Sequence, residues 1–236
     1  MTIPAIDSEA ETNFPLEMDL RDSEIMRLSD IVYMRLLRMI LSGDLKPGQQ
    51  VSELELTRHL KVSRTPVHEA MGQLIKDGLV IQRPNRRPVI ADFSSDDVYD
   101  IYEMRCILES EAAAKAASRI DRVTIARLHQ MADELKSILD LPHAFDQWVR
   151  FDDEFHAAIA KASGSKRLEE DITRYRRLNG VINKLHRDVS VLEPALEEHL
   201  DILKSLEDRD VEGSRQKMRR HLEEWQRFFV QHLVKK

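Results

Sequence analysis

Beyond Asp92, hydrophobic residues recur at the spacing of α-helices up to the C terminus, and this pattern limits the fold more than any other feature. No strand-like alternation and no Gly- or Pro-rich stretch interrupts it. Capping and helix-ending residues divide the pattern into six amphipathic segments, which predict an all-α bundle. The predicted helices cover Ser94 to Ser118 and roughly 122–139, 144–162, 166–187, 193–208 and 211–234.

The residues before Asp92 predict a different order of elements. Ser52 and Glu55 have the spacing of a capping box, and Thr65 with Pro66 predicts the start of a further helix with Thr65 as N-cap. Helix, helix, turn, helix and hairpin is the order of a winged helix-turn-helix. The helices are expected over 30–41, 52–60 and from Thr65 to Asp77, and the hairpin strands over 79–82 and 88–91. The expected fold class is therefore mainly α, with an N-terminal winged helix-turn-helix followed by an all-α helical bundle.

The chain of 236 residues is long enough for two domains with separate cores, and its charge divides in the same way. The net charge is −6, but residues 1–22 hold six acidic residues against one arginine and predict a mobile acidic tail. Residues 23–92 hold eleven Lys and Arg against eight Asp and Glu, a mildly basic balance that permits phosphate binding. Residues 93–236 form the predicted helical domain.

Two classes of protein are disfavoured by the sequence. No stretch approaches the roughly 20 apolar residues that span a bilayer, and the acidic N-terminal segment does not resemble a signal peptide, so we expect a cytoplasmic protein without membrane contact. The single cysteine, Cys106, excludes an internal disulfide framework.

The helix after Thr65 and the hairpin tip carry the residues expected to contact DNA. Major-groove reading needs an exposed helix whose first turn reaches base edges while neighbouring groups bind phosphates. Any one of these polar residues is as readily explained as a solvated side chain, but their joint placement on one helix face and one hairpin tip favours DNA binding. The candidates are Arg64, Thr65, His68 and Gln73 on the helix and Arg83, Arg86 and Arg87 on the hairpin.

A second candidate site lies in the helical half. Asp152 and His156 are four residues apart, so a helix places both on one face, and an antiparallel bundle can bring His199 and His221 to the same place. One carboxylate and three imidazoles suit zinc, nickel, manganese or iron(II). Spacing alone leaves the alternative of surface or hydrogen-bonded structural histidines open.

Residues 45–91 resemble the DNA-binding domain of the GntR family of bacterial transcriptional regulators. The matching phrases are VSRTPV at 62–67, GLV at 78–80 and PNR at 84–86. His68 stands where the family usually has an arginine, and Arg87 replaces a glycine at the wing tip. A free imidazole titrates near 6.5, so His68 also introduces a possible pH dependence of DNA binding.

The rest of the chain resembles the FCD ligand-binding domain of the FadR subgroup of that family. The matching phrases are YEMRCILE at 102–109, FDDEFH at 151–156, Glu198-His199 and MRRHL at 218–222. The resemblance implies a divalent metal, with zinc preferred, held by Asp152, His156, His199 and His221 beneath a small organic-acid effector. It also implies that Arg105 binds the effector carboxylate, for which an Arg105–Glu109 pair on the helix surface is the alternative.

Together these features predict a homodimeric transcriptional regulator that binds a double-stranded DNA operator. We expect it to act as a repressor and not as an enzyme. A metal-dependent hydrolase or oxygenase with the same Asp/His set is the first competitor, but the sequence offers no general base or nucleophile for it. An architectural DNA protein without sequence preference is the second, and scrambling the operator distinguishes it.

Overall fold

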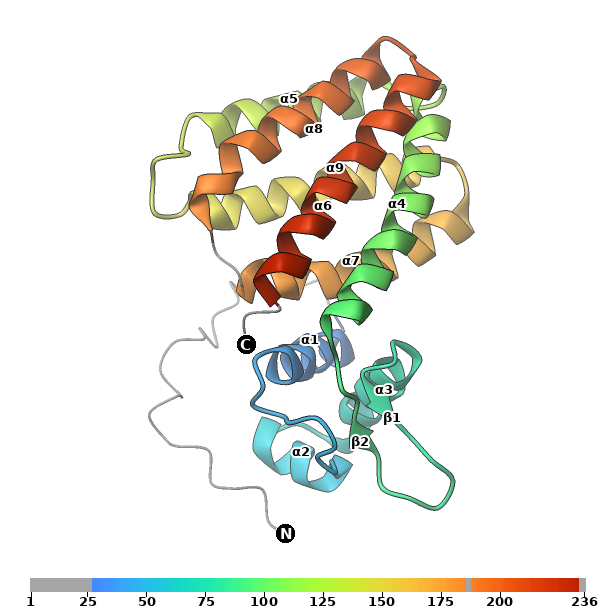
Figure 1. Ribbon diagram of the computed structural model, residues 1–236, viewed down its shortest axis with the longest axis vertical. Coiled ribbons are helices and arrows are strands. Elements are labelled where there is room, and N and C mark those ends of the chain that lie inside the picture. Colours follow the sequence, from blue (N-terminus) through green and yellow to red (C-terminus); the bar gives the residue numbers. More distant parts are fainter. Residues whose placement is uncertain (1–26, 186–187, 234–236) are drawn as a thin grey trace.

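The computed structural model describes residues 27–185 and 188–233, with the side chains of 181–185, 232 and 233 outside the description. The predicted tail over 1–22 lies outside the described residues. Figure 1 shows a small domain at one end of the molecule and a larger bundle of helices at the other. The predicted fold class is confirmed: an N-terminal helix-turn-helix with a short hairpin is followed by an all-helical domain.

The small domain is built on three helices and a two-stranded antiparallel sheet. Val80 pairs with Ile90 and Ile81 with Val89, and Gln50 makes a further bridge to Val89. Apolar side chains from all three helices and both strands share one core, because each helix keeps its hydrophobic residues on one face. The elements are α1 (Leu28–Leu41), α2 (Glu53–Leu60), α3 (Arg64–Lys76), β1 (Val80–Ile81) and β2 (Val89–Ile90).

One predicted helix start in this domain was wrong, and one predicted capping contact is absent. α3 begins at Arg64 with Ser63 as N-cap, so Thr65 lies inside the helix. Pro66 is tolerated there because the first four N–H groups of a helix have no intrahelical acceptor. Ser52 does precede α2, but its side chain makes no capping hydrogen bond, so the predicted capping box is absent.

In the described part of the helical domain, 93–185 and 188–233, there are six α-helices, as predicted. Ser94 and Asp97 form the predicted capping box at the start of α4, and α4 lies beside α9 along its length (Figure 1). A short 3-10 helix, η1 (Val189–Val191), was not predicted. The helices are α4 (Ser95–Ala117), α5 (Arg122–Lys136), α6 (Ala144–Ala162), α7 (Lys166–Leu185), α8 (Leu192–Glu207) and α9 (Val211–Leu233).

Helix α7 lies against the small domain, where it contacts α1 (Figure 1). Tyr175 and Leu178 of α7 pack into the core of the small domain. Beside them, Arg174 Nε donates to Asp77 Oδ1 at 2.6 Å, directly after α3, and Arg174 Nη2 donates to the carbonyl of Lys76. Tyr33 Oη of α1 donates to the same Asp77 at 2.7 Å. The end of the helix that follows the turn is therefore tied to the helical domain.

Within the described residues, no helix is both long and apolar enough to span a membrane.

Candidate metal centre and DNA-facing surface

Four side chains from three helices converge inside the helical domain. Asp152 and His156 lie one turn apart on α6, His199 comes from α8 and His221 from α9. All four are at most 5% exposed, and one potential ligand atom from each lies within 4.8 Å of the others. The packing of α6, α8 and α9 therefore brings together the four residues that the sequence predicted as a set.

The outer nitrogen of each histidine has an acceptor. Nδ1 of His156 lies 2.5 Å from Glu109 Oε2, Nδ1 of His199 lies 2.7 Å from the carbonyl of Ala195, and Nδ1 of His221 lies 2.6 Å from Glu198 Oε2. A proton on Nδ1 satisfies each acceptor and leaves Nε2 with a lone pair. Such outer contacts are typical of histidines that bind metals through Nε2.

The inner nitrogens point at one another and at a carboxylate. His199 Nε2 lies 3.4 Å from His156 Nε2 and 3.3 Å from Asp152 Oδ1, and His156 Nε2 lies 3.5 Å from the same oxygen. Lone pairs that face one another across a buried space repel unless a cation lies between them. This donor set fits a divalent metal ion with nitrogen and oxygen ligands.

The electrostatics of the site keep these groups in the form that binds metals. Burial lowers the pKa of His199, and burial together with the neighbouring histidines lowers that of His221 well below its usual value. Burial alone would raise the pKa of Asp152, but the Arg176 guanidinium beside it outweighs burial and holds that pKa well below its ordinary range. His199 and His221 are therefore neutral and Asp152 is ionised near neutral pH.

Glu198 behaves differently, because burial and the nearby Glu224 raise its pKa to about 8. Glu198 therefore holds its proton at a higher pH than an exposed glutamate does. A metal on His221 Nε2 requires the proton on Nδ1 and favours the ionised form of Glu198.

Arg105 is buried beside this centre and pairs with Glu109 on the same helix. Its Nε donates to Glu109 Oε1 at 2.7 Å, as in the helical pair considered above, but both residues are only 2% exposed, so the pair does not lie on the surface. Glu109 therefore links Arg105 to His156. Arg176 and Asn179 of α7 are also buried here, and Arg176 Nη2 donates to Asp152 Oδ2 at 2.7 Å.

A small cavity of about 10 Å³ lies next to the candidate ligands. That volume holds about one water molecule. Its walls come from α4, α6, α7 and α9 and combine cationic, aromatic and amide side chains. They are Tyr102, Arg105, Trp148, Asp152, Asn179, His221, Leu222 and Trp225.

At the other end of the molecule, the first turn of α3 is exposed and is held by α2. Arg64 Nε donates to Glu53 Oε2 at 3.1 Å, and His68 Nδ1 lies 2.7 Å from Glu53 Oε1. The side chains of Arg64 and His68 are 82% and 74% exposed, and Thr65 is exposed beside them. Glu53 thus holds two of the predicted DNA-contacting residues side by side.

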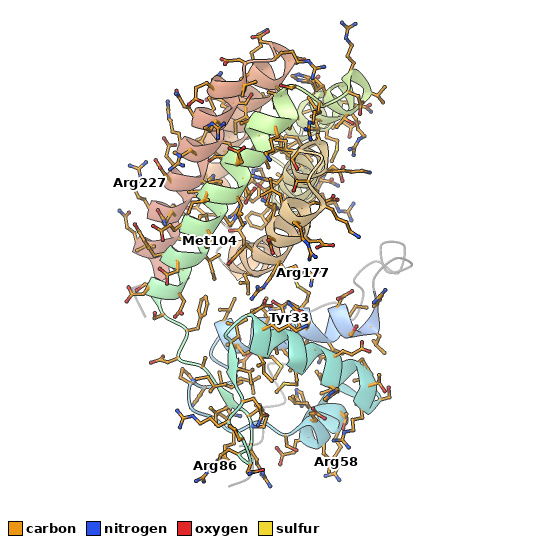
Figure 2. All side chains as sticks on the ribbon, turned by 90° about the vertical axis from the view of Figure 1, so that its right-hand side faces the viewer. Tyr33, Arg58, Arg86, Met104, Arg177 and Arg227 are labelled. Carbon is orange, nitrogen blue, oxygen red and sulfur yellow. The ribbon has the colours of Figure 1, made fainter. Side chains whose placement is uncertain are left out.

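The predicted wing residues Arg83, Arg86 and Arg87 are all exposed on the loop between β1 and β2. Figure 2 places Arg86 at the end of the molecule far from the helical domain, together with Arg58 of α2, which the sequence analysis did not single out. The sequence feature that could have pointed to Arg58 is its position as a basic residue in the last turn of a short helix.

Gln73 does not join this surface. Its amide donates to both carboxylate oxygens of Asp77, at 3.2 and 3.1 Å, where Asp77 also meets α1 and α7. Its predicted role in base reading is therefore corrected to a contact at the domain junction. Gln73 lies nine residues, more than two turns, along α3 from Arg64, so the two side chains are far apart on the helix.

Comparison with known proteins agrees with both halves of the molecule. Residues 28–90 match the model of bacterial regulatory proteins of the gntR family, and residues 100–224 match the FCD domain. An HTH-type transcriptional regulator from Agrobacterium vitis is 36% identical over 119 residues, which are 48% of this chain and 67% of that protein. The HTH-type transcriptional repressor RspR of Escherichia coli is 28% identical over 82% of this chain and 85% of its own length.

Solved structures show the same fold. Escherichia coli McbR/YncC superposes with a TM-score of 0.68 over 88% of this chain and 99% of that one, at 22% sequence identity. The FCD match covers more than half of the residues, and the gntR match covers the helix-turn-helix. The chain therefore belongs to the gntR family of bacterial regulatory proteins, as a transcriptional regulator with a C-terminal FCD domain.

Proposed function

We propose that this regulator binds operator DNA as a homodimer, and that a small organic acid bound at a divalent metal in the helical domain controls the binding. In this proposal residues 23–92 bind the operator, and residues 93–236 bind the effector and dimerise. The observation that carries it is the convergence of Asp152 and three histidines in a buried centre, with one potential ligand atom from each within 4.8 Å of the others and each Nδ1 bonded outside the centre.

Asp152, His156, His199 and His221 would hold the metal. Zinc suits three imidazoles and one carboxylate best, and nickel, manganese and iron(II) accept the same ligands. The metal would supply a Lewis acid that attracts an effector carboxylate. Arg105 lines the adjacent cavity. Its planar guanidinium would donate hydrogen bonds to the same effector carboxylate.

On the DNA side, Arg64, Thr65 and His68 would enter the major groove, while Arg83, Arg86 and Arg87 would follow the backbone or the minor groove. One short helix contacts too few base pairs to specify a site. A dimer that presents two such helices to the half-sites of a near-palindromic operator supplies the missing specificity.

Helix α7 would carry the signal between the two sites. Arg176 bonds Asp152, and Arg174, two residues earlier, bonds Asp77 at the end of α3. Two residues correspond to about 200° around a helix, so the two arginines face opposite sides of α7. An effector that changes the position of Asp152 would therefore move the helix that holds the DNA-reading element.

Repression, released by the effector, is the direction of control that we propose. Its support is the name of the Escherichia coli relative, a transcriptional repressor that aligns over most of both chains. An effector can release DNA only if it binds the two arrangements of the domains with different affinity.

The test measures the affinity for zinc and the affinity for DNA in separate experiments. Zinc titration of the metal-free protein should give one tight site per chain, and Asp152→Asn and His199→Ala should weaken it, while His129→Ala, a histidine paired with Glu207 near the surface, serves as the control. DNA affinity is measured for the segment upstream of the protein's own gene and for a scrambled copy at one fixed salt concentration, because phosphate contacts depend strongly on salt. A preference of roughly a thousandfold supports a specific regulator. Equal weak binding to both segments, or zinc binding unchanged in both variants, contradicts the proposal.

A further inference from the structure

Trp148 carries a buried hydrogen-bond donor that the fold does not use. Its side chain lies on α6 at the wall of the cavity, between Phe145 and Trp225, and is only 3% exposed. Its Nε1 has no acceptor among the described residues. Because a buried N–H without an acceptor costs free energy, a persistent donor of this kind at a cavity wall indicates a ligand.

The groups around the cavity are mainly donors and cations. Arg105 lines it, and Arg176, bonded to the neighbouring Asp152, has a second buried donor, Nη1, that also lacks an acceptor among the described residues. Asn179 Oδ1 accepts the hydroxyl of Tyr102. The amide nitrogen of Asn179 is then a further donor toward a ligand.

The nearby carboxylates are already engaged. Asp152 accepts from Arg176 and faces the histidines, and Glu109 accepts from Arg105 and His156. Glu198 and Glu224 line a different cavity, between α8 and α9. A ligand ammonium group would therefore meet Arg105, with Arg176 close behind Asp152, and no carboxylate without a partner.

We propose that Trp148 determines the specificity of the effector site by donating its indole N–H to an oxygen atom next to the effector carboxylate. The effector is then a compact hydroxy- or oxo-carboxylate, and the corresponding amino acid is rejected. The inference rests on the proposed function, since it assumes that a carboxylate binds beside the metal and Arg105. The cavity has room for about one water-sized group, so the ligand is small and its entry moves the walls.

The size of the effect follows from the chemistry of recognition. A site built to donate a hydrogen bond to a ligand oxygen rejects an analogue without that oxygen by large factors, because its buried donor is left without an acceptor. An ammonium group adds repulsion from Arg105 and Arg176. We expect the amino analogues to bind at least about a hundredfold more weakly than the hydroxy analogues.

The experiment uses the full zinc-loaded chain and two matched series of acids. The three-carbon series is lactate, pyruvate, alanine and propanoate, and the four-carbon series is malate, oxaloacetate, aspartate and succinate. Calorimetry and thermal shift should show binding of the hydroxy and oxo acids of at least one series and much weaker binding of the amino acids. Equal binding of the hydroxy and amino members, or no binding of any hydroxy or oxo acid, overturns the inference.

Trp148→Phe removes the N–H and keeps an aromatic ring at the wall. The variant should lose the preference for the hydroxy acid over the unsubstituted acid. Trp225→Phe is the matched control, because Trp225 lines the same cavity and its ring centroid lies 5.7 Å from that of Trp148. An unchanged preference in Trp148→Phe, or an equal loss in both variants, overturns the role of Trp148.

Zinc stoichiometry separates this inference from the proposed function. If the wild-type chain takes up no zinc, the metal proposal fails first. If zinc binds with the expected stoichiometry and the acids do not discriminate as stated, only the role of Trp148 fails. Circular dichroism checks that each variant is folded, and the wild-type acid series decides the ligand class even if Trp148→Phe is unstable.

Discussion

Replacing Arg174 with alanine should loosen the junction between the two domains without changing either site directly. Arg174 Nε donates to Asp77 Oδ1 at 2.6 Å, and the Asp77 side chain is 1% exposed. A hydrogen bond between charged groups contributes about 1.5–3 kcal/mol when it is shielded from water. The Arg174 side chain is 39% exposed, so solvent screening lowers the expected loss to about 1–2 kcal/mol.

The loss should appear where the contact is made. Urea denaturation measures the change in the free energy of unfolding, and hydrogen exchange followed by mass spectrometry measures the opening of residues 73–80 at the end of α3. Exchange there should accelerate by about five- to thirtyfold, which corresponds to the same free energy. Zinc affinity should stay within about twofold of the wild type, because the metal ligands do not contact Arg174.

A matched control lies on the same helix. Arg167 pairs with Glu170 at 3.6 Å, but its side chain is 93% exposed, so Arg167→Ala should change stability very little. The reasoning is refuted if Arg174→Ala leaves exchange at the end of α3 unchanged, or if both alanine variants have the same effect.

Three further predictions concern the two sites. In the metal-free protein, burial lowers the pKa of His199 and His221, so the unfolded chain binds protons first as the pH falls below about 6.5. As the pH falls from about 6.5 to 5, the free energy of unfolding should decrease by up to about 1.4 kcal/mol per pH unit for each histidine. Urea denaturation at several pH values measures it, and a constant or rising value over that range would contradict the prediction. Glu198→Gln should weaken zinc binding about 10- to 100-fold and reduce the number of protons released when zinc binds. Calorimetry in buffers of different ionisation enthalpy measures both quantities, and an unchanged zinc affinity would exclude a role for Glu198 in orienting His221. Arg86→Ala should weaken binding to operator and scrambled DNA equally and reduce the slope of log affinity against log salt concentration by about 1. Arg64→Ala should weaken binding to the operator more than binding to scrambled DNA. An equal loss of affinity for both DNAs in Arg64→Ala would mean that Arg64 contacts phosphate alone.

Much of the fold could be predicted because the signals are local. α6 has the predicted bounds, and the Ser94–Asp97 capping box marks the start of α4 by chemistry that involves four consecutive residues. The start of α3 was misplaced because two neighbouring residues, Ser63 and Thr65, are both good N-caps and Pro66 fits any position in the first turn. Local rules rank such alternatives poorly.

The site was predictable only in part for a different reason. Each histidine of the site lies in a short sequence phrase that resembles the family, so each could be identified from the sequence separately. Arg176 lies in the sequence TRYRRLN, where three arginines look alike and suggest a solvated face. Only the packing of α7 against both α6 and the small domain shows that Arg176 is buried, that Arg174 meets Asp77 and that Arg177 is exposed.

That placement explains why a charged helix can lie between two cores. Burying Arg176 is tolerable because Asp152 and Asp153 both accept from its Nη2, at 2.7 and 2.9 Å, whereas Tyr175 and Leu178 provide the apolar contact with the small domain. An ion pair of this kind does little for stability compared with apolar packing, but it does fix the rotation of α7 about its axis. A ligand or metal that competes for Asp152 would therefore weaken the contact that sets this rotation, while the apolar contacts keep the helix in place. Rotation of α7 rather than separation of the domains is then the smallest movement that can reach α3 through Arg174.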